Sequence, residues 1–229
     1  MLRLLNIIRN WHDTPRSGNF DNSYRSAFLD AVQFTRGLGF AVTPVSWIEP
    51  VELNREDLIR RSLGAAGLTD SRGSAGQCLK WSHFLAPYIS EVANCPAWVT
   101  LGQLWKGKTP VFEPTMDDVR SWVARGISID DLSSGQGLKL HAWITLATGE
   151  IIEPTLMTTI ASCHDHYRKF DGAVMMADAE EFTPHRYVPL AVGSNVVEGI
   201  ARRSSIPLLA EDVAELTMVG VILARPDLI

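Results

Sequence analysis

The chain has few cysteines, no long apolar run and no strong excess of charge of either sign. Its 229 residues include only Cys78, Cys95 and Cys163, an odd number without a Cys-x-x-Cys pair. A disulfide framework or a structural zinc knuckle is therefore not expected, and a reducing compartment is the simpler assumption. The longest apolar candidate, residues 216–224, falls far short of the roughly 20 residues that a membrane span needs.

The charge balance and the N-terminal residues narrow the classes of partner and the compartment. A formal net charge of −5 with scattered basic residues leaves no patch for a polyanion. We therefore expect no nucleic-acid partner and no membrane partner. Residues 1–9 are too short and too interrupted to be the core of a signal peptide. These features predict a cytoplasmic protein, although delivery by a secretion system that needs no signal peptide stays open.

The length, the hydrophobic content of 46% and the absence of internal repeats predict a single domain over residues 1–229. Periodicity, capping residues and turn residues indicate an alternation of helices with short β-rich segments. We expect helices at 23–35, 53–63, 115–124, 195–202 and 210–216, and strands or extended segments at 40–47, 97–105, 111–112, 173–176, 187–190 and 218–223.

The stretch Gly73–Trp81 places a lone cysteine near the start of a further helix. Ser74 and Gln77 fit a capping box, which predicts a helix from Ala75 to about Ala86, ended by Pro87. Cys78 would lie about one turn in, where free N–H groups and the helix dipole favour a thiolate. The alternative is that Cys78 is a small buried apolar residue, as free cysteines often are.

A second stretch supplies the partners that a nucleophilic thiol requires. Leu138–Leu146 is predicted to be a strand with His141 near its start, and Glu150–Thr155 is predicted to be its return strand after a turn at Thr148-Gly149. A cysteine, a histidine base and a carboxylate that orients the histidine are the three groups of a thiol triad. The alternative for His141 is a structural strand histidine.

These motifs resemble the transglutaminase-like branch of the papain-fold cysteine enzymes. That family combines a cysteine at a helix start, a strand reading HAWV and a strand that ends in Asp-Pro-Thr, and here the matching segments read HAWI and IIEPT. The resemblance covers about a third of the chain, residues 74–155, and is closest to bacterial members such as the leader-peptide proteases of lasso-peptide maturation. One departure is glutamate in place of aspartate.

The resemblance implies a papain-like α+β fold with N-terminal helices packed on an antiparallel sheet. It also implies a catalytic core at about 74–155 and a C-terminal extension at about 156–229. Cys78 would be the nucleophile, His141 the base and Glu153 the orienting acid. The reaction would be attack on an amide or peptide bond through a thioester, and protease, deamidase, amidase and transglutaminase all remain open. The substrate would be a peptide or protein, with no cofactor and no metal.

The hairpin raises a geometric question about Glu153. With a two-residue turn it would pair opposite Ile144 and face away from His141, and with a three-residue loop it would lie roughly four residues, about 13 Å, along the ladder. We therefore expect a bulge or strong twist near Pro154. Should another side chain orient His141, Gln103 is the next candidate.

Four residues are candidates for oxyanion or substrate binding. Besides the Cys78 backbone N–H, an oxyanion would need a side-chain donor, for which Gln77 and Trp81 are candidates. Trp81 has the alternative of being plain core. Gln103 and Trp143 complete the set.

Two other functions remain open. A zinc-dependent hydrolase would use His164 and His166 of the run Cys163-His164-Asp165-His166, with His185 as a further ligand. In a helix, however, His164 and His166 would point about 200° apart. A non-enzymatic binding or structural protein on the same fold is the other alternative. Whether the protein is an enzyme or a binding protein, the C-terminal extension would cover the site or bind a protein partner.

Overall fold

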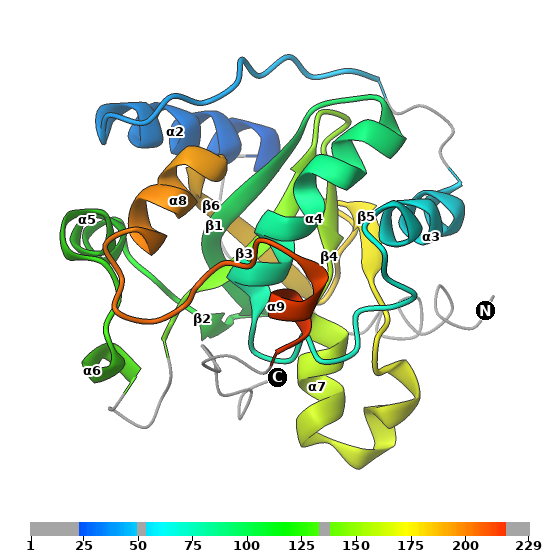
Figure 1. Cartoon of the computed structure of the whole chain (residues 1–229). Helices are drawn as coiled ribbons and strands as arrows, with labels where there is room; N and C mark the ends of the chain where they lie inside the picture. The colour runs from blue at the N-terminus through cyan, green and yellow to red at the C-terminus, as the bar shows by residue number, and fades with distance from the viewer. Residues whose placement is uncertain (1–22, 50–53, 133–137, 219–229) are drawn as a thin grey trace.

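The computed structural model describes residues 23–49, 54–132 and 138–218, and these form an α+β fold (Figure 1). The described strands make one six-stranded antiparallel sheet, which confirms the expected combination of helices and antiparallel sheet. The strands are β1 (Ala97–Lys106), β2 (Thr109–Phe112), β3 (His141–Leu146), β4 (Glu150–Glu153), β5 (Met175–Asp178) and β6 (His185–Val192).

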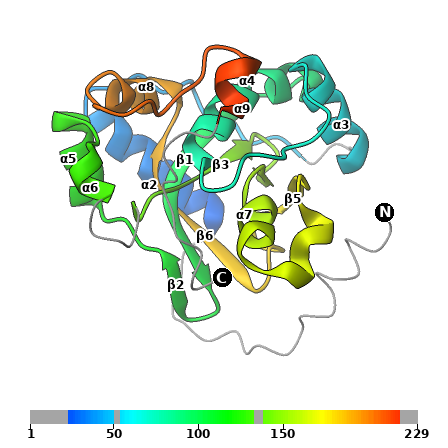
Figure 2. The same cartoon turned by 60° about the horizontal axis from the view of Figure 1, so that its bottom comes forward.

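Helices cover both faces of this sheet. In Figures 1 and 2, α4 and α8 lie on one face and α2 lies on the other. The described helices are α2 (Tyr24–Gly37), α3 (Arg55–Ala65), α4 (Cys78–Ala93), α5 (Met116–Arg125), α6 (Ile129–Leu132), α7 (Leu156–Cys163), the 3₁₀ helix η1 (Asp165–Phe170), α8 (Ser194–Ala201) and α9 (Val213–Thr217). None of the described helices is both long and apolar enough to cross a membrane.

Strand β1 organises the sheet because it pairs with three other strands. Its residues 97–102 pair with β3 and its residues 104–106 pair with β2, while β6 pairs along residues 100–106. Since β6 overlaps both of the other pairings, β2 and β3 share the opposite edge of β1. His141, the first residue of β3, lies opposite Gly102, where β1 changes from one partner to the other.

Helices α2, α3 and α5 begin at side-chain caps, and those of α3 and α5 were predicted. Ser23 caps α2 and Asn54 caps α3, each through its side chain. Thr115 and Asp118 form a reciprocal capping box on α5, which ends at Gly126. These short-range signals are reliable because a side chain within three residues satisfies N–H groups that the helix leaves without partners.

The predicted bounds of the cysteine helix are wrong at both ends. Gly76 has a φ of 67°, which interrupts a helix, so α4 begins three residues later than predicted, at Cys78. Ser74 is therefore not the cap, and Gln77 donates to the Gly73 carbonyl instead of closing a capping box. Pro87 lies inside the helix, which continues to Ala93 and ends with Asn94 in the left-handed conformation.

The register of the hairpin also differs from the prediction, and the observed register brings Glu153 near His141. Ile144 pairs with Ile152 and Thr145 pairs with Ile151, so the loop has three residues. Continuing this register puts Glu153 opposite Trp143, two residues from His141 and on the same face. Such diagonal neighbours are about 7–8 Å apart, within reach of long side chains. The expected bulge is not needed, and the 13 Å separation was wrong.

The C-terminal residues contribute to the same sheet. Strand β5 pairs with β4, and β6 pairs with β1. The segment 40–47 forms no strand, and β3 begins at His141, three residues after the predicted start. Of the strand expected at 218–223, all but Met218 lies outside the described residues.

Gly102 offers a test of this packing. A Cβ there would overlap the backbone carbonyl oxygen of Val188 and lie 2.7 Å from the Trp143 ring. We expect Gly102→Ala to lower the free energy of unfolding by about 3 kcal/mol, as overpacking does. Urea unfolding measures this loss.

Gly64→Ala is the matched control. Among the described residues, no atom of another part of the chain lies within 4 Å of a Cβ at Gly64, which is in helix α3. Alanine should stabilise the protein there by about 0.5–1 kcal/mol because it favours helix. Equal effects of the two substitutions would contradict the account of β1.

Candidate active site

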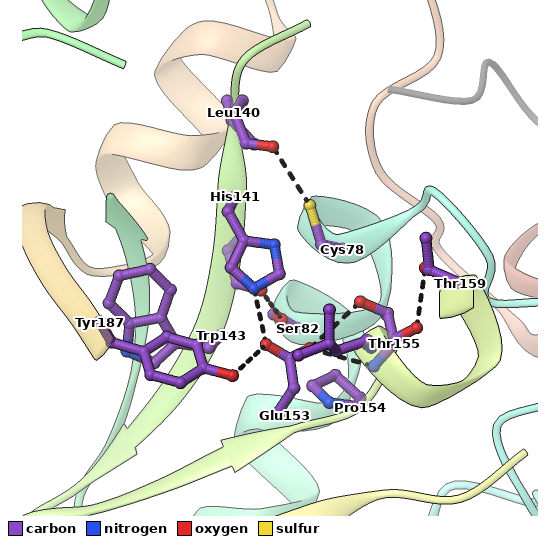
Figure 3. Close-up of polar contacts among 12 residues, drawn as sticks. Cys78, Ser82, Leu140, His141, Trp143, Glu153, Pro154, Thr155, Thr159 and Tyr187 are labelled. Atoms are coloured by element: carbon purple, nitrogen blue, oxygen red, sulfur yellow. Dashed lines mark hydrogen bonds and ion pairs between the residues drawn. The ribbon is translucent and has the colours of Figure 1, made fainter. Parts of the chain in front are cut away.

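Three element ends bring the predicted triad together. Cys78 is the first residue of α4, His141 the first residue of β3 and Glu153 the last residue of β4. Figure 3 shows the imidazole of His141 between the sulfur of Cys78 and the carboxylate of Glu153. All three side chains are buried, with Cys78 only 3% exposed.

Cys78 sits where a helix start meets the beginning of a strand. Its thiol donates to the carbonyl of Leu140, with an Sγ to O distance of 3.7 Å. Gln77, the residue before the helix, provides no side-chain cap. Cys78 therefore lies at the positive end of the α4 dipole, a position that favours a negative charge.

Glu153 is held by donors on both of its oxygens. Its Oε2 accepts from His141 Nε2 at 2.7 Å and from the Tyr187 hydroxyl at 3.3 Å. Its Oε1 accepts from the backbone N–H and the hydroxyl of Thr155 at 3.1 and 3.2 Å and from the N–H of Leu156 at 3.3 Å. Since α7 begins at Leu156, the carboxylate also lies at the positive end of a helix dipole. These donors satisfy both oxygens of the buried side chain.

The hydrogen bond to Glu153 determines which ring nitrogen of His141 faces Cys78. A carboxylate can only accept, so Nε2 carries hydrogen and Nδ1 is the nitrogen left for Cys78. Burial lowers the pKa of His141, but the charge of Glu153 and the hydrogen bonds to Cys78 and Glu153 outweigh it and raise the pKa from 6.5 to about 10. His141 is therefore an imidazolium at neutral pH.

Three aromatic rings surround the imidazole. Phe112 stacks on it with ring centroids 5.1 Å apart, and Trp143 and Tyr187 lie at 5.9 and 6.0 Å. Register explains the grouping, because Phe112 and Tyr187 both pair with Leu104, two residues along β1 from the partner of His141. Aromatic faces favour a cation, so the rings favour the imidazolium.

The other predicted residues have different surroundings. The Gln77 amide is bonded to Gly73, and its Oε1 has no partner in the described part of the chain. The Nε1 of fully buried Trp81 also has no partner there. Trp143 donates its N–H to Tyr24 at 2.7 Å, and Gln103 bonds to Pro114 and Trp105. Gln103 is therefore not the group that orients His141.

Tyr187 and Phe112 are site residues that the sequence reasoning missed. Both belong to strands whose pairing with β1 no local pattern reveals. Thr155 was within the IIEPT motif but was not identified as a donor to Glu153. Its position two residues after the acid is the one signal that could have found it.

The candidate zinc ligands do not come together. The rings of His164 and His166 are 6.2 Å apart, and His185 lies on β6. Across residues 23–49, 54–132 and 138–218, no three His, Cys, Asp or Glu residues form a group that could hold a metal ion.

Comparisons with protein-family models, with curated proteins and with solved structures find no match for this chain.

The raised pKa of His141 predicts how stability depends on pH. The folded pKa of about 10 exceeds the ordinary value of 6.5, so this contribution is complete below about pH 6.5 and is lost as the pH rises through about 10. We expect the free energy of unfolding of the wild type to decrease as the pH rises from about 6.5 to about 10.

Glu153→Gln should reduce this fall, because the variant loses the carboxylate charge that is the largest opponent of burial in setting the pKa of His141. Urea unfolding of both proteins at several pH values measures the two curves. Parallel curves for the wild type and Glu153→Gln would show that the pair does not hold the proton.

Proposed function

We propose that this protein is a cysteine-dependent hydrolase or acyltransferase that acts on an amide bond of a peptide or protein. The observation that supports this proposal is the imidazole of His141 lying between the sulfur of Cys78 and the carboxylate of Glu153, with its Nε2 2.7 Å from Oε2 of Glu153. The arrangement of a helix-start cysteine, a strand histidine and a strand-end acid on an antiparallel sheet is also what a papain-like fold requires. We propose that fold on the same grounds.

The chemistry follows from the protonation of the pair. In the reactive ion pair the proton of Cys78 is already on Nδ1 of the His141 imidazolium, and the thiolate attacks the amide carbon, forming a C–S bond. When the C–N bond breaks, His141 gives this proton to the leaving amine. The product on the enzyme is a thioester, and the neutral His141 that remains is ready to act as a base.

The second half of the reaction decides between hydrolysis and transfer. His141 takes a proton from water or from an amine, and the resulting nucleophile displaces Cys78 from the thioester. The oxyanion of both steps would lie against the N–H of Cys78 at the start of α4, where the helix dipole opposes the developing negative charge. Glu153 keeps the imidazole oriented throughout.

Alkylation of Cys78 by iodoacetamide tests the thiol chemistry without knowledge of the substrate. Because His141 is the proposed proton partner of Cys78, the reaction of Cys78 with iodoacetamide should depend on His141. At about pH 6 we expect Cys78 to react at least about tenfold faster in the wild type than in His141→Gln, since an ordinary thiol is almost fully protonated there. Peptide mapping by mass spectrometry locates the label.

Cys163 provides the internal control because it is exposed and lies outside the site. Its rate should be the same in both proteins, because His141 does not act on it. Equal rates for Cys78 with and without His141 would refute the proposed thiol chemistry.

A further inference from the structure

Tyr187 shares an oxygen of Glu153 with His141. The Oε2 atom that accepts from His141 Nε2 at 2.7 Å also accepts from the Tyr187 hydroxyl at 3.3 Å. Tyr187 comes from β6, across β1 from the other two residues, and its side chain is buried. Figure 3 shows its hydroxyl pointing at the carboxylate from the side away from Cys78.

We propose that Tyr187 is a positioning residue of this site, which weakens the hold of Glu153 on the proton of His141 by donating to the same oxygen. The proposal rests on the proposed function, since it concerns the base of that reaction. A donor on Oε2 withdraws part of the negative charge that attracts the imidazolium.

Such a counterweight matters because the groups that favour the imidazolium outweigh burial, which opposes it. The carboxylate and the three rings favour the imidazolium, and the pKa of His141 is about 10. Breakdown of a thioester requires neutral His141 to accept a proton from water. Each increase in the proton affinity of His141 therefore lowers the neutral fraction of His141 at neutral pH by the same factor, and this slows the step.

Two features allow this role to be separated from packing. Burial and the charge of Glu153 raise the pKa of Tyr187 well above its usual value, so its hydroxyl remains a donor at working pH. The other oxygen, Oε1, has three donors from Thr155 and Leu156. These donors keep the carboxylate in place when the hydroxyl is removed.

Tyr187→Phe is the test, since it removes the hydroxyl and keeps the ring. We expect the titration midpoint of His141, measured by ¹⁵N imidazole NMR, to rise by about 0.5–1 pH unit, the size of one hydrogen bond. The signal among the six histidines is assigned from His141→Gln. With p-nitrophenyl acetate as acyl donor, the burst should persist while steady-state turnover at neutral pH falls about three- to tenfold.

Tyr88→Phe is the matched control, because Tyr88 lies on α4 with its ring beside Phe84. It should change neither the midpoint nor the turnover. An unchanged or lowered midpoint in Tyr187→Phe would overturn the role of Tyr187 alone. Absence of a burst in the wild type would instead count against the proposed function, and the NMR midpoint would still report on the shared oxygen.

Discussion

The buried ion pair between His141 and Glu153 is the interaction on which the site depends. Both side chains are almost fully enclosed, and taking two charges out of water is costly unless they are paired and hydrogen-bonded. The structure meets this condition with donors from Thr155, Leu156 and Tyr187 on the carboxylate. Removing one partner of such a pair typically costs about 3–5 kcal/mol, so the pair constrains the ends of β3, β4 and α7 together.

The sheet positions this pair at the point where β1 stops pairing with β3 and begins to pair with β2. Because β3 begins at His141 and β2 continues along the same edge, the histidine lies at a break between two strands. The ring of Phe112 fills the space beside it, and Tyr187 approaches from β6 across Gly102 and Leu104. On the other face, α4 brings Cys78 to the carbonyl just before His141. The thiol and its base thus come from opposite sides of one strand end.

The sequence predicted the parts of this arrangement that local rules govern. The caps of α3 and α5 and the bounds of β1 followed from neighbouring residues. Cys78, His141 and Glu153 followed from motifs whose chemistry is readable residue by residue. The start of α4 was wrong because Gly76 takes a positive φ that the apparent capping box concealed. Tyr187 and Phe112 were not predictable, since their places depend on pairings with β1 between distant segments.

The central claim is that Cys78 is a nucleophile activated by His141. Peptide mapping after brief reaction with p-nitrophenyl acetate and acid quench tests it most directly, because a thioester is the intermediate that the account requires. The account predicts an acetyl group on Cys78 in the wild type that is lost in His141→Gln. An acetyl group confined to exposed nucleophiles such as Cys163, in the wild type as in the variant, would contradict it.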